Sequence, residues 1–168
     1  FELSKLLSMK EYDVVGCTYD RKSAMAIHKK VKAGDINALS AFQGSKYIQS
    51  NTVEAFRDVL TSKKAVIFGT PCQIAGLDNF LRLRRRREDY ILVDLICHGV
   101  PSIYLWHKYI QEGSEKYGYG NTPDVHFRYK KMGWKKIHIK LSGNGKKYIK
   151  RNSRDIFYRY FELQNCYM

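Results

Sequence analysis

The sequence lacks the patterns by which several classes of protein are recognised. No apolar run in its 168 residues approaches the roughly 20 residues that a membrane-spanning helix needs. The amino end shows neither the basic leader nor the apolar region of a signal peptide. Gly-x-Gly-x-x-Gly and Walker sequences are missing, so a nicotinamide site of the Rossmann type is not supported. These absences predict a cytoplasmic protein without a membrane span.

Cysteine is scarce and widely spaced. The cysteines are Cys17, Cys72, Cys97 and Cys166, and no Cys-x-x-Cys pair occurs among them. This spacing excludes a disulfide framework and fits a reducing compartment. An iron–sulfur site wholly within this segment is not expected, because such clusters usually need four closely spaced cysteines. Cys166 is instead a candidate metal ligand, the first of a cluster completed beyond residue 168.

Positive charge is in excess, with 30 Lys and Arg against 16 Asp and Glu and a formal net charge of +14. Anionic cofactors, an acidic protein partner and nucleic acid could each account for it. The 13 tyrosines among the lysines suit single-stranded nucleic acid. No recognition motif of the common nucleic-acid modules is present, however. A non-catalytic basic module that binds nucleic acid or an acidic protein is therefore the alternative function, and nucleic acid is not the expected partner.

One stretch carries the clearest chemistry. Residues 65–69 predict a buried strand that ends in glycine, after which Thr70 can cap a helix and Pro71 suits its first position. Cys72 and Gln73 then fall in the first helical turn, just past the carboxyl end of the strand. Unpaired N–H groups and the helix dipole at such a turn bind anions and lower the pKa of a thiol. The competing interpretation is that Cys72 is a small buried hydrophobe.

A second strand–turn–helix unit repeats this design. Residues 90–97 predict a strand that is buried on both faces, and Ser102 is expected to cap a helix that ends near Gln111. Successive βα units imply parallel neighbouring strands, and ligands bind where the carboxyl ends of such strands meet. The residues expected to converge there are Cys72, Gln73, Cys97 and His98, joined by the loop of Ser45, Lys46 and Tyr47.

The pair of Cys72 and His98 is a candidate catalytic pair, because a histidine can activate a cysteine nucleophile. A cysteine-dependent transferase is therefore a third possible function. No third, orienting group and no protease signature accompanies the pair.

The remaining patterns predict an α/β fold with a mixed sheet, parallel at its centre and built from βα units, plus an antiparallel β-meander. We expect the end of a helix before residue 10, strands at 12–19 and 25–31, a helix at 52–60 and a glycine-rich boundary at 113–121. The whole is expected to be a single α/β domain over 1–168, an excerpt of a longer chain, because the sequence starts without Met and stops abruptly. Within it we expect a βα core at 1–112, a β-meander at 121–150 and a terminal helix at 153–168 that leads to a Cys-rich segment.

Four segments resemble one family in order and spacing. They are Gly-Ser-Lys-Tyr-Ile-Gln-Ser at 44–50, Gly-Thr-Pro-Cys-Gln-Ile-Ala-Gly-Leu at 69–77, Asp-Leu-Ile-Cys-His-Gly-Val-Pro-Ser at 94–102 and Phe-Arg-Tyr-Lys-Lys-Met-Gly-Trp at 127–134. Together they are similar to the C-terminal, flavin-binding domain of the coenzyme F-420 hydrogenase/dehydrogenase beta-subunit family. The ferredoxin-like cysteine segment and the glycine-rich stretch that usually precede this domain do not occur in the sequence.

The resemblance implies a flavoprotein subunit that binds FAD and passes electrons between iron–sulfur clusters, of the 4Fe-4S type, and a soluble hydride carrier. The carrier is the deazaflavin F-420 in archaeal members, and the redox partner is a ferredoxin-like domain or subunit. By position, the implied flavin contacts are Ser45, Lys46, Tyr47, Thr70, Pro71, Cys72, Gln73, Cys97, His98 and Gly99. The later Cys-x-x-Cys of the family would begin near Cys166.

Overall fold

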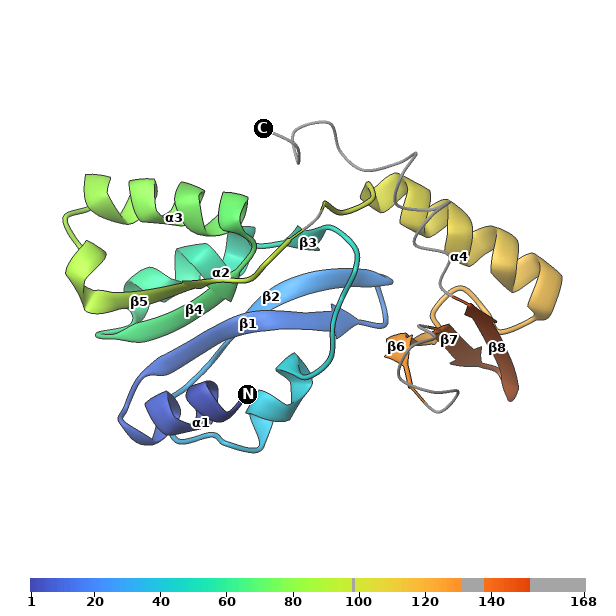
Figure 1. Cartoon of the computed structure of the whole chain (residues 1–168), viewed down its shortest axis with the longest axis horizontal. Helices are drawn as coiled ribbons and strands as arrows, with labels where there is room; N and C mark the ends of the chain where they lie inside the picture. Colours follow the sequence, from blue (N-terminus) through green and yellow to red (C-terminus); the bar gives the residue numbers. More distant parts are fainter. Residues whose placement is uncertain (98, 131–137, 152–168) are drawn as a thin grey trace. The chain divides into compact units, whose positions relative to one another are not determined.

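The computed structural model describes residues 1–97, 99–130 and 138–151 (Figure 1). The chain divides into two compact units, which are described separately below. Unit 1 comprises Phe1–Thr18, Ile27–Gln43 and Ser50–Cys97, and unit 2 comprises Tyr19–Ala26, Gly44–Gln49 and His98–Met168. The single domain expected from the sequence stays a prediction.

A five-stranded sheet has the strand order β3-β2-β1-β4-β5. Its strands are β1 (Asp13–Asp20), β2 (Met25–Val31), β3 (Ser50–Asn51), β4 (Ala65–Gly69) and β5 (Tyr90–Asp94). β1 pairs with β4 and β4 with β5, both in parallel. A four-residue turn joins β1 to β2, which is too short for a parallel crossover. The sheet is mixed with parallel strands at its centre, so the predicted α/β class is confirmed.

Helices cover both faces of the sheet in unit 1 (Figure 1). The elements are α2 (Val53–Asp58) and α3 (Pro71–Leu83) on one face, and α1 (Glu2–Met9) and the 3-10 turn η1 (Ala38–Phe42) on the other. Neighbouring strand residues point to opposite faces. Val15 and Ile67 therefore pack under α2 and α3, while Val14 and Val66 pack toward the α1 side, and all four are fully buried. Strands that are covered on both faces have continuous apolar sequences, and for this reason residues 65–68 predict a buried strand clearly.

β5 is shorter than the sequence indicates, because it ends at Asp94 and not at Cys97. Its last pair joins Gly69 to Asp94, and Leu95 N then donates to Gly69 O at 2.8 Å. β4 ends at Gly69, so the chain beyond has no strand to pair with. Ile96 is consequently 93% exposed, although its apolar character suggested a buried strand.

The first helix, α1, is present as predicted, but its packed face differs from its leucine pattern. Only Leu7 of the expected apolar positions packs against the core. Leu3 and Leu6 are 46% and 52% exposed. Ser8 is buried instead, and its hydroxyl accepts a hydrogen bond from Gly34 N at 3.0 Å. A loop N–H that needs a partner thus places a serine on the inner side of the helix.

Unit 2 combines α4 (Ile103–Tyr117) with a three-stranded antiparallel sheet in the order β6-β7-β8. The strands are β6 (Asp124–Tyr129), β7 (His138–Gly143) and β8 (Lys146–Arg151). Asn144 and Gly145 form the two-residue turn between β7 and β8 with φ of 48° and 70°, as a predicted Asn-Gly hairpin requires. Aromatic rings form the core: Trp106 and Phe127 lie 5.2 Å apart between ring centroids. The antiparallel meander is therefore present.

α4 extends past the end that the sequence predicts. Gly113, expected in a flexible boundary, lies inside this helix, which ends at Gly118 with a left-handed φ of 70°. The hydroxyl of Tyr119 lies 1.9 Å from the point where a Cβ on residue 113 would stand. The glycine is therefore needed for close packing within a helix and does not mark its end.

Some expectations lie outside the described residues. They are the part of the β-meander at 131–137, the terminal helix at 153–168, His98 and Cys166.

Candidate functional site

The start of α3 is built as the sequence predicts. Thr70 is the N-cap, Pro71 takes the first helical position, and Thr70 and Gln73 form a capping box. Gln73 Oε1 accepts the Thr70 N–H at 3.0 Å. Because β4 ends at the preceding glycine, this first turn lies at the carboxyl edge of the sheet.

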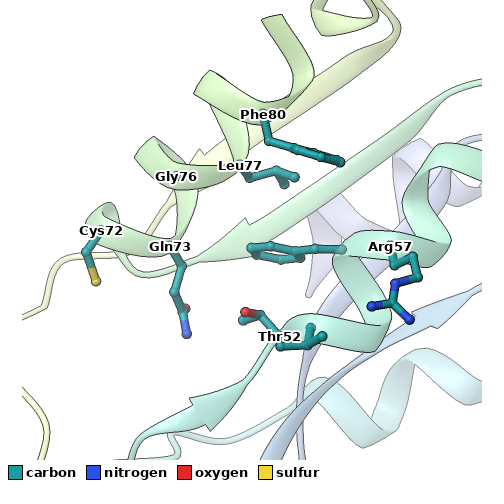
Figure 2. Close-up of a pocket in the computed structure, with 9 residues that line it drawn as sticks. Thr52, Arg57, Cys72, Gln73, Gly76, Leu77 and Phe80 are labelled. Carbon is teal, nitrogen blue, oxygen red and sulfur yellow. The ribbon is translucent and has the colours of Figure 1, made fainter. Parts of the chain in front are cut away.

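Gln73 also connects α3 to a segment far away in the sequence. Its Nε2 donates to Ser50 Oγ, in β3, at 2.9 Å. The carboxamide thus has its oxygen bound within α3 and its nitrogen bound to the strand that leads into α2. Figure 2 shows the Gln73 side chain extending from α3 toward Thr52. This one side chain therefore links the two segments.

Cys72 is an exposed, free thiol on the same turn. Its sulfur lies 3.2 Å from Thr70 Oγ1, and either atom could be the donor. The thiol is therefore not the small buried hydrophobe that the sequence left open. Its expected partner His98 lies outside the described residues, so the catalytic pair of Cys72 and His98 stays a prediction.

An open groove of about 410 Å³ lies between α2 and α3 and begins at this turn (Figure 2). It is lined by Thr52, Val53, Phe56, Arg57, Cys72, Gln73, Gly76, Leu77 and Phe80. Leu77 is buried, at 2% exposed, and provides an apolar floor. A Cβ added to Gly76 would meet no atom within 4 Å. The missing side chain at this helical position therefore keeps part of the groove open.

The two aromatic rings of the groove, those of Phe56 and Phe80, each contact another side chain. The Phe56 ring packs edge to face against the ring of His28, which is buried, and the two centroids are 5.8 Å apart. His28 Nε2 is in turn 3.0 Å from Phe68 O. The Phe80 ring has the guanidinium carbon of Arg84 at 5.4 Å from its centroid. The groove walls are therefore supported by packing beneath one ring and by a cation against the other.

The electrostatics of the groove come from Arg57. In Figure 2 its side chain lies at the end of the groove opposite Cys72. It is exposed, and within the described part of the chain it forms no hydrogen bond or ion pair. At the other end are the first-turn N–H groups of α3, which carry the positive end of the helix dipole. The groove between α2 and α3 therefore favours negative charge at both of its ends.

The other expected site residues are distributed over both units. Cys97 is half-buried in unit 1, where the Leu95 bond to Gly69 holds the nearby chain against the end of β4. Ser45, Lys46, Tyr47 and Gly99 belong to unit 2, where the Tyr47 ring meets Phe127 at 6.5 Å and 90°. The structure brings Thr70, Pro71, Cys72 and Gln73 together, and a role for each expected residue stays a prediction.

No metal centre is formed by the residues that the structure describes. Within 1–97, 99–130 and 138–151, no group of three or more His, Cys, Asp or Glu side chains could hold a metal ion. Cys17, Cys72 and Cys97 form no disulfide with one another. The described residues therefore do not fit an iron–sulfur cluster, and Cys166 falls outside them.

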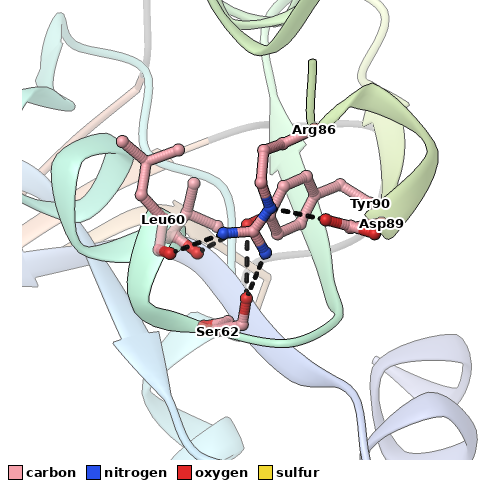
Figure 3. A network of polar contacts seen from close by, with 6 residues as sticks. Leu60, Ser62, Arg86, Asp89 and Tyr90 are labelled. Carbon is pink, nitrogen blue, oxygen red and sulfur yellow. Dashed lines mark hydrogen bonds and ion pairs between the residues drawn. The ribbon is translucent and has the colours of Figure 1, made fainter. Parts of the chain in front are cut away.

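The arginine-rich end of α3 is used inside unit 1. Arg86 donates from Nη1 to Leu60 O and from Nη2 to Ser62 O, both at 2.9 Å, and from Nε to Asp89 at 2.5 Å (Figure 3). Tyr90 OH donates to Ser62 O at 3.2 Å and completes the network. The neighbouring arginines Arg82 and Arg87 both bind the carboxylate of Asp78, and these hydrogen bonds lower its pKa. Three of the arginines are thus occupied by contacts that hold α3 and β5 in place.

The groove between α2 and α3 is the feature that the sequence did not reveal. Phe56, Arg57 and Phe80 are not among the site residues expected from the sequence. A weak signal was available in Gly76, because a glycine in a helix interior costs about 0.5–1 kcal/mol relative to alanine and so indicates a local requirement.

A parallel βα unit with a ligand-sized groove beside the helix start is typical of α/β proteins that bind small molecules. Residues 62–168 match the model of one family, the C terminus of the beta subunit of coenzyme F420 hydrogenase/dehydrogenase. The chain belongs to this family, which confirms the resemblance. The matched range holds three of the four segments that carried the resemblance, and the segment at 44–50 lies outside it.

The fold is also similar to that of a chain in the F420-reducing [NiFe] hydrogenase complex from Methanosarcina barkeri, solved as a xenon derivative. The TM-score is 0.59 at 12% sequence identity, and the match covers 98% of this chain and 55% of that chain. The present chain therefore spans about half the length of that protein. A comparison with curated proteins gave no match. None of the helices in the described residues has the length and apolar character needed to cross a membrane.

Proposed function

We propose that this chain is the flavin-binding part of an oxidoreductase subunit, which passes electrons between iron–sulfur clusters and a soluble hydride carrier. The carrier is a deazaflavin of the F-420 type or another small molecule that accepts hydride. Membership in the family supports this class of function. The single observation that carries the proposal for this chain is the apolar groove that opens beside the first turn of α3.

The residues of the groove fit the ring system of a flavin. That ring is planar, apolar at one end and rich in hydrogen-bonding groups at the other. Phe56, Phe80 and Leu77 offer apolar and aromatic surface, whereas Thr52 and Gln73 place polar groups at the edge. The volume of about 410 Å³ is in the usual range of small-molecule sites and suits a ring system better than a whole dinucleotide.

Each residue of the groove has a definite part in this proposal. Arg57 supplies positive charge for a phosphate or for negative charge on the reduced ring, and the N–H groups at the start of α3 do the same from the other end. Leu77 and the two phenylalanines exclude water from the ring face. When bound, the flavin supplies the exchange between hydride and single electrons. The protein contributes placement and electrostatics.

The roles that the family resemblance implies for the other expected residues are proposed separately from the groove. Flavin contacts are proposed for Ser45, Lys46, Tyr47, Thr70, Pro71, Cys72, Gln73, Cys97, His98 and Gly99, and a catalytic role for Cys72 with His98. Cys166 is proposed as the first ligand of an iron–sulfur cluster completed beyond residue 168, and the proposed redox partner is a ferredoxin-like domain or subunit. A cytoplasmic location belongs to the same proposal, because Cys72 is an exposed thiol outside any disulfide.

The test is the visible absorption spectrum of the purified protein, isolated without oxygen and then incubated with FAD and with iron and sulfide. The proposal predicts flavin bands that remain with the protein after removal of free FAD. A protein that stays colourless after both treatments, while its circular dichroism shows a folded chain, would contradict it.

A further inference from the structure

Unit 2 contains a second pocket that the proposed flavin site does not use. Its volume is about 300 Å³, and three separate segments line it. They are the β1–β2 turn with Lys22, Ser23 and Ala24, the middle of α4 with His107, Ile110 and Gln111, and the loop before β6 with Asn121 and Thr122. All of these residues lie within one compact unit.

Two sets of contacts fix the walls of this pocket in place. Arg21 Nε donates to Thr122 O at 2.7 Å, and its guanidinium forms an ion pair with Asp124 at 3.4 Å, so the β1–β2 turn is tied to the loop before β6. Trp106 Nε1 donates to Ala24 O at 2.8 Å and ties the same turn to α4. The pocket is therefore held open by bonds on both sides of the turn.

The turn itself carries backbone strain. Ala24 has a φ of 51°, a left-handed conformation that residues with a Cβ rarely adopt, and it is 6% exposed. Such strain persists only where the surroundings impose it, and it is concentrated at sites that hold ligands or change conformation. Here the consequence of the strained turn is that Lys22 and Ser23 stand at the mouth of the pocket.

Lys22 carries the positive charge among the residues that line the pocket, and its other polar side chains can each donate a hydrogen bond. Lys22, His107, Asn121 and Thr122 form no side-chain hydrogen bond or ion pair within the described part of the chain. No carboxylate lines the pocket, because Asp20 accepts bonds from Ser23 and Asp124 is paired with Arg21. The nearby Glu115 accepts a hydrogen bond from Gln111 at 3.2 Å. Ala24 and Ile110 provide a small buried, apolar floor.

We propose that this pocket binds an oxyanion of the phosphate type. Lys22 supplies the charge, His107, Asn121 and Thr122 supply further hydrogen bonds, and the remaining volume accommodates a small polar group attached to the phosphate. Charge-assisted hydrogen bonds to an anion are among the stronger polar contacts in proteins, and the bonds made by Arg21 and Trp106 hold together the segments that carry these side chains. This inference does not depend on flavin binding at the groove between α2 and α3, so either assignment can fail alone.

The experiment is an NMR titration of the purified protein with inorganic phosphate, in which the imidazole signals of His107 report on the pocket. The matched variants are Lys22→Gln and Lys108→Gln. Lys108 lies next to His107 on α4 but pairs with Glu112 at 3.8 Å and does not line the pocket. We expect a saturable shift of the His107 signals, with affinity about fivefold weaker in Lys22→Gln and unchanged in Lys108→Gln.

A second titration with FAD in the presence of bound phosphate distinguishes the source of the oxyanion. Displacement of phosphate from His107 by FAD would show that the pocket takes the phosphate of a larger cofactor, and no displacement would assign it to a separate phosphorylated molecule. The proposal is overturned if phosphate produces no saturable shift, or if both lysine variants weaken binding equally.

Discussion

Gln73 holds Ser50 at 2.9 Å through its Nε2, while its Oε1 caps the N–H of Thr70 at 3.0 Å. One carboxamide therefore serves both as the end of the α3 capping box and as the connection between α3 and the strand that enters α2. Gln73 also lines the groove between these two helices, so the contact joins segments on both sides of it.

Replacement of Gln73 separates the structural role from the binding role. Gln73→Ala removes both hydrogen bonds and should lower the free energy of unfolding by about 1 kcal/mol, as the loss of a helix cap does. Gln73→Glu keeps an acceptor for the cap, so its stability should remain close to that of the wild type. Its negative charge should nevertheless weaken FAD binding. Urea unfolding and FAD titration check the two effects, and a Gln73→Glu protein that binds FAD normally would contradict the placement of the flavin.

Two helical glycines should respond in opposite ways to alanine. Gly76→Ala places a methyl group in open space, so it should stabilise the protein by about 0.5–1 kcal/mol. Gly113→Ala forces a methyl group against the Tyr119 hydroxyl and should destabilise by about 1–3 kcal/mol. Thermal unfolding measures both. Equal shifts in the two variants would show that the space around these helices differs from that described.

The Arg86 network should depend on the forked shape of its guanidinium. Arg86→Lys keeps the charge but cannot reach Leu60 O, Ser62 O and Asp89 together, so we expect a lower midpoint of thermal unfolding. Arg85→Gln is the control, because Arg85 makes no side-chain contact within the described residues. If the two variants unfold at the same temperature, the network does not hold the segment of Arg86 and Asp89 against residues 60–62.

The buried tyrosines of unit 2 predict a loss of stability at alkaline pH. Burial, with a smaller contribution from Tyr119, raises the pKa of Tyr109 from 10.0 to about 12. Above pH 10 the unfolded chain releases the phenol proton while the folded chain keeps it, so stability falls until about pH 12 and then levels off. Tyr109→Phe should make the slope of the unfolding free energy against pH shallower, by an amount that corresponds to at most one bound proton. Urea unfolding between pH 9 and pH 12 measures the difference, and identical slopes would contradict the burial of this phenol.

The local structure around β4 and α3 could be predicted because its signals are close in sequence. Gly69, Thr70, Pro71 and Gln73 each favour the observed conformation by their own chemistry, without help from distant residues. The strand β4 was equally clear, since both of its faces are buried.

Other features depend on contacts that a sequence does not display. β5 ends early because its partner β4 ends at Gly69, and Gly113 is helical because the Tyr119 hydroxyl fills the space beside it. The groove was missed for the same reason. The sequence did not single out Phe80, and only the arrangement of α2 against α3 leaves the rings of Phe56 and Phe80 at an open surface.

The central claim is that the groove between α2 and α3 holds a flavin ring. The most direct measurement is an equilibrium titration with FAD, followed by flavin fluorescence, on the wild type, Gly76→Leu and Ala75→Leu. Gly76 lines the groove, whereas Ala75 is exposed on the same helix outside it. We predict saturable binding to the wild type and to Ala75→Leu, and its loss in a folded Gly76→Leu protein. Equal binding by all three proteins, or by none, would contradict the account.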